Sequence, residues 1–118
     1  MLESQVFSLN ETPVHLGLGA TVVRQERFTG DPSWYTAYGV RHAADGAEGR
    51  LVSLHTFHEP WKGWEMHPQG EELVVCIAGV IILHQEINGA VRTVRLSPGE
   101  AVVNPRGAWH TADVEGTA

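Results

Sequence analysis

The sequence is poor in cysteine, in lysine and in long apolar runs, and each shortage excludes a class of protein. Cys76 is the single cysteine among 118 residues, so one chain forms neither a disulfide framework nor a cysteine-type zinc site. Lys62 is the single lysine, and the dispersed arginines and net charge of −6 leave no basic stripe for the phosphates of nucleic acid. The longest apolar stretch, Leu73 to Leu83, is far shorter than the roughly 18 residues that suggest a membrane span. We therefore expect neither nucleic acid nor a membrane as a partner.

The length and composition are typical of one globular domain. With 42% hydrophobic and 19% charged residues, the chain is too apolar for a disordered segment. The N-terminal residues Met1 to Val6 lack a positive region followed by an apolar one, so we expect no signal peptide and a cytoplasmic location. A weak helical period over Leu2, Val6 and Leu9 predicts one short N-terminal turn.

Short runs rich in Val, Ile, Thr and aromatic residues alternate with Gly, Pro and Asp, at intervals of about 8–12 residues. This spacing predicts an antiparallel all-β domain without long amphipathic helices. The expected strands are 20–28, 34–41, 50–57, 73–78, 80–86, 90–96, 101–104 and 110–114. Asn88-Gly89 lies between two of these strands and predicts a two-residue hairpin turn of type I′.

Two motifs that carry metal-ligand residue types flank this hairpin. In the first, His67 is followed by four residues, then Glu72, then six residues, then Gly79. In the second, Gly99 is followed by five residues, then Pro105-Arg106-Gly107, then two residues, then His110.

This pair resembles the two motifs of the cupin superfamily, G(x)5HxH(x)3-4E(x)6G and G(x)5PxG(x)2H(x)3N. The chain departs from the pattern at three positions, where Glu65 replaces the first histidine, Glu59 the leading glycine and Val114 the closing asparagine. The resemblance implies a small single-domain cupin, a double-stranded β-helix or jelly-roll-like barrel, in which residues 1–49 supply covering strands and residues 50–118 the barrel core. The pattern leaves the barrel short of one C-terminal strand, so we expect a homodimer in which a second subunit covers the open edge.

The resemblance also implies that Glu65, His67, Glu72 and His110 hold one divalent transition metal ion. The residue types agree with this, because two imidazoles with one or two carboxylates suit Fe, Mn, Ni, Cu or Zn. Glu65 and His67 are two apart and would point to one face of an extended segment. The motif spacing to Gly79 favours Glu72 over its neighbour Glu71.

Several assignments stay open at the level of sequence. Glu65 is a ligand, a catalytic acid or base that shuttles a proton, or a simple ion-pair partner. The aromatic side chains beside the motifs form a wall for a small organic ligand or close the barrel end; these are Trp61, Trp64 and Trp109. Cys76 is expected to be a buried, inert thiol. The remaining histidines fit neither motif and are expected to have no ligand role; these are His15, His42, His55, His58 and His84.

The function implied by the resemblance is metal-dependent chemistry on a small organic molecule, of the dioxygenase, isomerase or lyase type. A non-catalytic domain that binds or senses a small ligand is the alternative, and a metal-free remnant of an enzyme is a third hypothesis. The fold alone does not choose among them.

Overall fold

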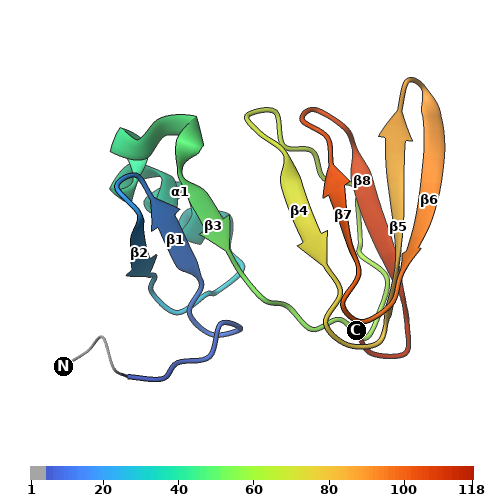
Figure 1. Cartoon of the computed structure of the whole chain (residues 1–118), viewed down its shortest axis with the longest axis horizontal. Coiled ribbons are helices and arrows are strands. Elements are labelled where there is room, and N and C mark those ends of the chain that lie inside the picture. The colour runs from blue at the N-terminus through green and yellow to red at the C-terminus, as the bar shows by residue number, and fades with distance from the viewer. Residues whose placement is uncertain (1–4) are drawn as a thin grey trace. The chain divides into compact units, whose positions relative to one another are not determined.

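The computed structural model describes residues 5–118, and the chain forms two compact units, one up to His55 and one from Thr56 to Ala118 (Figure 1). Residues 1–4, which carry part of the expected N-terminal turn, lie outside the described residues. None of the helices between residues 5 and 118 has the length and apolar character needed to cross a membrane.

The first unit combines a small antiparallel sheet with helical segments. Its strands are β1 (Val14–Gly17), β2 (Thr21–Arg24) and β3 (Arg50–Val52), in the order β2-β1-β3. The α-helix α1 (Pro32–Arg41) and the 3-10 segment η2 (Ala43–Glu48) lie between β2 and β3 in the chain. The short strand β1 was not expected from the sequence.

The strand expected at residues 34–41 is wrong, because this segment is the helix α1. Pro32 begins the helix, where its fixed φ suits the first turn and its missing N–H leaves no hydrogen bond unmade. Trp34 and Tyr38 are four residues apart, which places them on one helix face, and their rings stack with centroids 5.9 Å apart. Aromatic residues favour strands in general, and here the packing of one helical face overrides that preference.

The second unit contains two antiparallel sheets (Figure 1). One pairs β4 (Glu72–Val75) with β7 (Ala101–Asn104), and the other has the order β6-β5-β8, with β5 (Val80–Ile87), β6 (Ala90–Leu96) and β8 (His110–Glu115). The strands expected at 90–96 and 101–104 are confirmed with the same bounds. The expected hairpin is also confirmed, since Asn88 and Gly89 join β5 to β6 with φ values of 52° and 79°.

Within the part of the chain that is described, the strands form three separate antiparallel sheets and no closed barrel. The mostly β character that the sequence predicts is therefore confirmed, whereas the closed barrel is not seen. The physical reason is that β4 and β7 pair with each other only, which leaves the outer edge of each without a neighbouring strand.

The core of the second unit lies around the middle of β5. Its buried apolar side chains are Cys76, Leu83, Leu96 and Ala112. The thiol of Cys76 is fully buried, as expected, and donates to the carbonyl oxygen of Ala78 at 3.3 Å.

One face of the β4–β7 pair is apolar and exposed. Leu73 lies directly opposite Val103 in the pair, and both side chains are exposed, as is Val75. A second subunit was expected at the open edge of the barrel, and the homodimer stays a prediction.

Candidate metal centre

Backbone hydrogen bonds of the second unit bring the two sequence motifs together. Glu65 and His110 form an isolated antiparallel bridge, in which each N–H donates to the other residue's carbonyl at 2.8 Å. The N–H of Gly107, in the turn before His110, donates to the carbonyl oxygen of His67 at 2.9 Å. Glu72 begins β4, and its partner in the register is Asn104 at the end of β7. Segments about 40 residues apart in the chain are therefore held at one place.

All four predicted ligand side chains meet at this place. Nε2 of His67 lies 3.3 Å from Oε2 of Glu72, and Nε2 of His110 lies 3.2 Å from Oε1 of the same carboxylate. The carboxylate of Glu65 lies farther away, 3.9 Å from Nε2 of His110. Glu72 thus contacts each histidine through a different carboxylate oxygen, whereas the group whose ligand atoms lie close enough to share one ion contains Glu65, His67 and His110.

The site has one buried anchor and an exposed side. The side chain of His110 is 1% exposed, whereas those of His67 and Glu65 are 45% and 58% exposed. The exposed side chains of His67 and Glu65 would leave an ion held here accessible from solvent.

The hydrogen bonding of His110 fixes which of its nitrogens can bind a cation. Its Nδ1 lies 3.3 Å from the carbonyl oxygen of Ala108, which only accepts, so Nδ1 carries the hydrogen. In the neutral ring Nε2 then has a lone pair, and this nitrogen is buried without a hydrogen-bond partner. The lone pair faces two carboxylates, an arrangement that is unfavourable unless a proton or a metal ion lies between them.

The donor set fits a divalent transition metal ion. Two imidazole nitrogens and carboxylate oxygens suit Fe, Mn, Ni, Cu or Zn, and an N–H donated to a backbone carbonyl is the usual support of a metal-bound histidine. Two groups among the described residues could hold such an ion, one of which contains Glu65, His67 and His110.

The second group contains His15, His42 and Asp45 of the first unit, and these two histidines were expected to have no ligand role. Asp45 accepts from Nε2 of His15 at 2.6 Å, so this nitrogen carries the hydrogen. Nδ1 of His15 is then free to accept from the hydroxyl of Tyr38, also at 2.6 Å. Burial raises the pKa of the Tyr38 phenol and the charge of Asp45 raises it further, which keeps this hydroxyl protonated.

These contacts favour a hydrogen-bonded chain over a metal site at His15. Both of its ring nitrogens are used, and its ring stacks on that of His42 with centroids 3.7 Å apart and planes 13° apart. The lone pairs of stacked rings lie in nearly parallel planes and do not converge on one ion. Gly49 leaves the room for this packing, because a Cβ there would lie 2.6 Å from Cε1 of His15.

The environment of His42 predicts a loss of stability in mild acid. Burial lowers the pKa of the His42 imidazole, and the nearby His15 and Arg41 lower it further, against an opposing effect of Asp45. Gln25 acts in the same direction, since its Oε1 accepts from Arg41 and its amide nitrogen therefore faces Nε2 of His42 at 2.9 Å. The folded state thus keeps His42 neutral where the unfolded chain, with a pKa of about 6.5, takes up a proton.

We therefore expect the first unit to lose stability as the pH falls below about 6.5. Urea denaturation at pH 7 and pH 5, followed by the NMR signals of β1, measures this loss. His42→Gln should reduce the difference between the two pH values, and His84→Gln, a change in the second unit, should not. An unchanged difference in His42→Gln would show that another group is responsible.

The tryptophans beside the motifs differ in their surroundings. Trp61 packs its ring edge-on against His110, with centroids 6.1 Å apart, and so forms part of the wall of the site. Trp64 and Trp109 are exposed.

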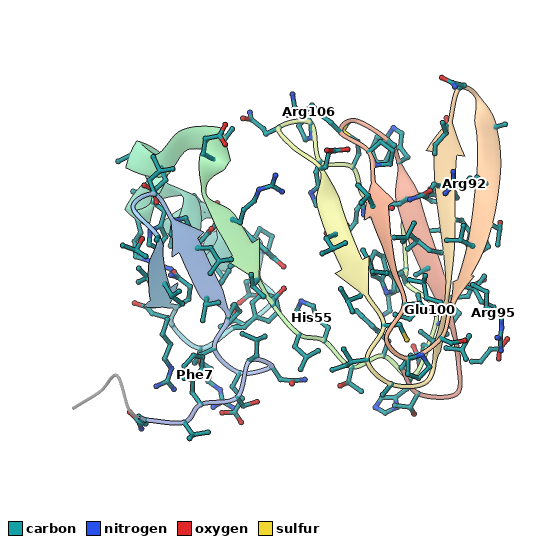
Figure 2. All side chains as sticks on the ribbon, viewed as in Figure 1. Phe7, His55, Arg92, Arg95, Glu100 and Arg106 are labelled. Carbon is teal, nitrogen blue, oxygen red and sulfur yellow. The ribbon has the colours of Figure 1, made fainter. Side chains whose placement is uncertain are left out.

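Figure 2 shows Arg92 and Arg95 along β6 and Arg106 in the turn between β7 and β8. This turn also borders a cavity of about 250 Å³, lined by Glu86, Ile87, Asn88, Pro105, Arg106, Gly107 and Ala108.

The four residues predicted from the motifs lie near one another in the second unit, with Glu72 outside the group of three that could hold an ion, and their role as ligands stays a prediction. Comparison with protein-family models, with curated proteins and with solved structures finds no match to the chain.

Proposed function

We propose that the second unit is a cupin-type metal centre, in which Glu65, His67, Glu72 and His110 hold one divalent transition metal ion for chemistry on a small organic molecule. The observation that carries the proposal is the Nε2 of His110, which is buried without a hydrogen-bond partner and faces the carboxylates of Glu65 and Glu72. A cation between these groups removes the repulsion of their lone pairs. The spacing of both motifs, which resembles that of cupins, supports the same assignment.

The chemistry that such an ion supplies when bound is the polarisation of a substrate oxygen or the activation of O2. The chain's own residues have separate tasks. His110 is the fixed anchor, because its ring is buried and its Nδ1 is held by the carbonyl of Ala108. Glu65 has the longest contact and the most exposed side chain of the group, which suits a carboxylate that takes up or releases a proton at Oε2.

An open surface depression lies beside the turn that precedes His110. The turn Gly107-Ala108 contacts both histidines through its backbone and also lines the cavity of about 250 Å³. Glu86 and Arg106 give this cavity both signs of charge, and Trp61 adds an aromatic surface next to His110.

An activity screen of metal-loaded protein tests the proposal. Untagged protein loaded with Fe²⁺ or Mn²⁺ is offered catechols, thiols and small keto acids, while oxygen consumption and product formation are recorded. We expect turnover with wild type and none with His67→Gln. Ligand binding without turnover would favour the binding or sensing alternative, and an absence of both ligand and metal binding would overturn the proposal.

The charge of Glu65 predicts how the site treats anions. Two histidines and two ionised glutamates cancel the charge of a divalent ion, whereas three histidines and one glutamate leave +1. We expect Glu65→His to tighten the binding of oxalate by about tenfold or more, because a full charge at this distance interacts by several kcal/mol at intermediate dielectric. Calorimetric titration of both proteins at matched metal occupancy measures the change. Equal oxalate affinities would mean that Glu65 is not a ligand and acts as a proton shuttle or ion-pair partner.

A further inference from the structure

Two fully buried amide side chains, Gln85 and Asn104, lie behind the candidate metal centre. Both are 1% exposed. Gln85 on β5 is the register partner of His110 on β8, and Asn104 on β7 is the register partner of Glu72 on β4. Each of the two sheets of the second unit therefore contains one amide that lies directly opposite a proposed metal ligand.

A hydrogen bond between the two amides joins these sheets. Nε2 of Gln85 donates to Oδ1 of Asn104 at 2.7 Å and to the carbonyl oxygen of Val103 at 2.9 Å. Nδ2 of Asn104 then donates to Oε1 of Glu72 at 2.9 Å. The side chains form a continuous chain of donors from β5 to the carboxylate.

The direction of this chain is fixed by its ends. The carbonyl of Val103 only accepts, so the NH₂ group of Gln85 must face it, and the second hydrogen of that group is then aimed at Oδ1 of Asn104. The NH₂ group of Asn104 is consequently turned toward Glu72, whose ionised carboxylate only accepts. No amide can be flipped without placing two acceptors or two donors face to face.

We propose that Gln85 and Asn104 are positioning residues that hold the Glu72 carboxylate against His110 and thereby set the metal affinity of the site; this inference rests on the proposed function. Glu72 needs such support because its side chain is 35% exposed and, without Asn104, is free to turn toward water. Oε1 of Glu72 is the atom that Asn104 holds and also the one 3.2 Å from Nε2 of His110. Loss of the hydrogen bond therefore acts on the spacing of two ligands at once.

The test compares Asn104→Leu and Gln85→Met with wild type, with Co²⁺ as the probe. Gln85→Met removes only the donors of the amide, since Oε1 of Gln85 has no partner to lose. We expect each variant to bind Co²⁺ about 10–100-fold more weakly, the range typical of lost hydrogen bonds to a metal ligand. The visible spectrum of bound Co²⁺ should also change, because the ligand geometry changes. Leu83→Val is the matched control, because it alters the same face of β5 without removing a polar atom, and its affinity and spectrum should stay those of wild type.

The side-chain amide protons of Asn104 give a second readout in metal-free protein. In wild type they should exchange slowly with solvent, and in Gln85→Met they should exchange faster, which keeps the test informative if Asn104→Leu does not fold. Wild-type affinity and spectrum in Gln85→Met would overturn the positioning role alone. A wild-type protein that binds no Co²⁺ would overturn the proposed function and this inference together.

Discussion

Replacement of both His67 and His110 by glutamine is expected to lower the affinity for Zn²⁺ by more than about 100-fold. Loss of a hydrogen bond to a ligand typically costs about 10–100-fold, and here two ligands are lost. Glutamine keeps a polar side chain of similar size at the buried position 110, so the fold should survive. Competition with a chromophoric chelator measures the affinity.

The matched control for this experiment is a variant with His42→Gln and His84→Gln. It also removes two histidines, but His42 stacks on His15 in the first unit, and His84 contacts Thr93 and Asp113 on the β6-β5-β8 sheet. We expect its Zn²⁺ affinity to equal that of wild type. If instead the control loses the metal and the His67 and His110 variant keeps it, the site has been assigned to the wrong residues.

The second large effect is a loss of stability of the second unit on truncation of Leu83. Leu83 is fully buried at the middle of β5, with Val94 of β6 on one side and Ala112 of β8 on the other. We expect Leu83→Ala to lower the free energy of unfolding of the second unit by about 2–5 kcal/mol, through lost burial and the cavity left behind. Urea denaturation of the metal-free protein, followed by tryptophan fluorescence, measures this loss.

A substitution at an exposed strand position serves as the control for the loss of stability expected in Leu83→Ala. Val91 lies on the neighbouring strand β6 and is 58% exposed. Val91→Ala should change the free energy of unfolding by less than about 0.5 kcal/mol. Similar losses for the two variants would mean that the core of this unit is not centred on Leu83.

The parts of the fold that the sequence predicts best are those set by local chemistry. Asn88-Gly89 specifies its hairpin because both residues tolerate a positive φ, and the hairpin fixes the pairing of β5 with β6. The helix α1 was missed because Trp34, Tyr35 and Tyr38 favour a strand locally, whereas their rings pack on one another in the helix. Closure of a barrel depends on which strands pair across long loops, and local patterns carry little information on that.

The site residues also divide into those that local sequence spacing predicts and those that depend on pairing between distant strands. His67, Glu72 and His110 could be found because their spacing follows a known pattern, and the structure brings them within contact distance. Gln85 and Asn104 could not, because each becomes relevant only through its register partner on another strand.

The same holds for the hydrogen-bonded chain of the first unit. Tyr38, His15 and Asp45 come from a helix, a strand and a 3-10 segment, and no fixed spacing relates them. A sequence motif would not have identified them.

The central claim is that one divalent metal ion binds between the two motifs of the second unit. Titration of ¹⁵N-labelled wild-type protein with one equivalent of Zn²⁺ tests it most directly, because the amide signals report both binding and location. We predict that the signals of Glu65, His67, Glu72 and His110 shift until one equivalent is reached, while those of His15 and Asp45 stay unchanged. Signals that do not move, or shifts confined to His15, His42 and Asp45, would contradict the account.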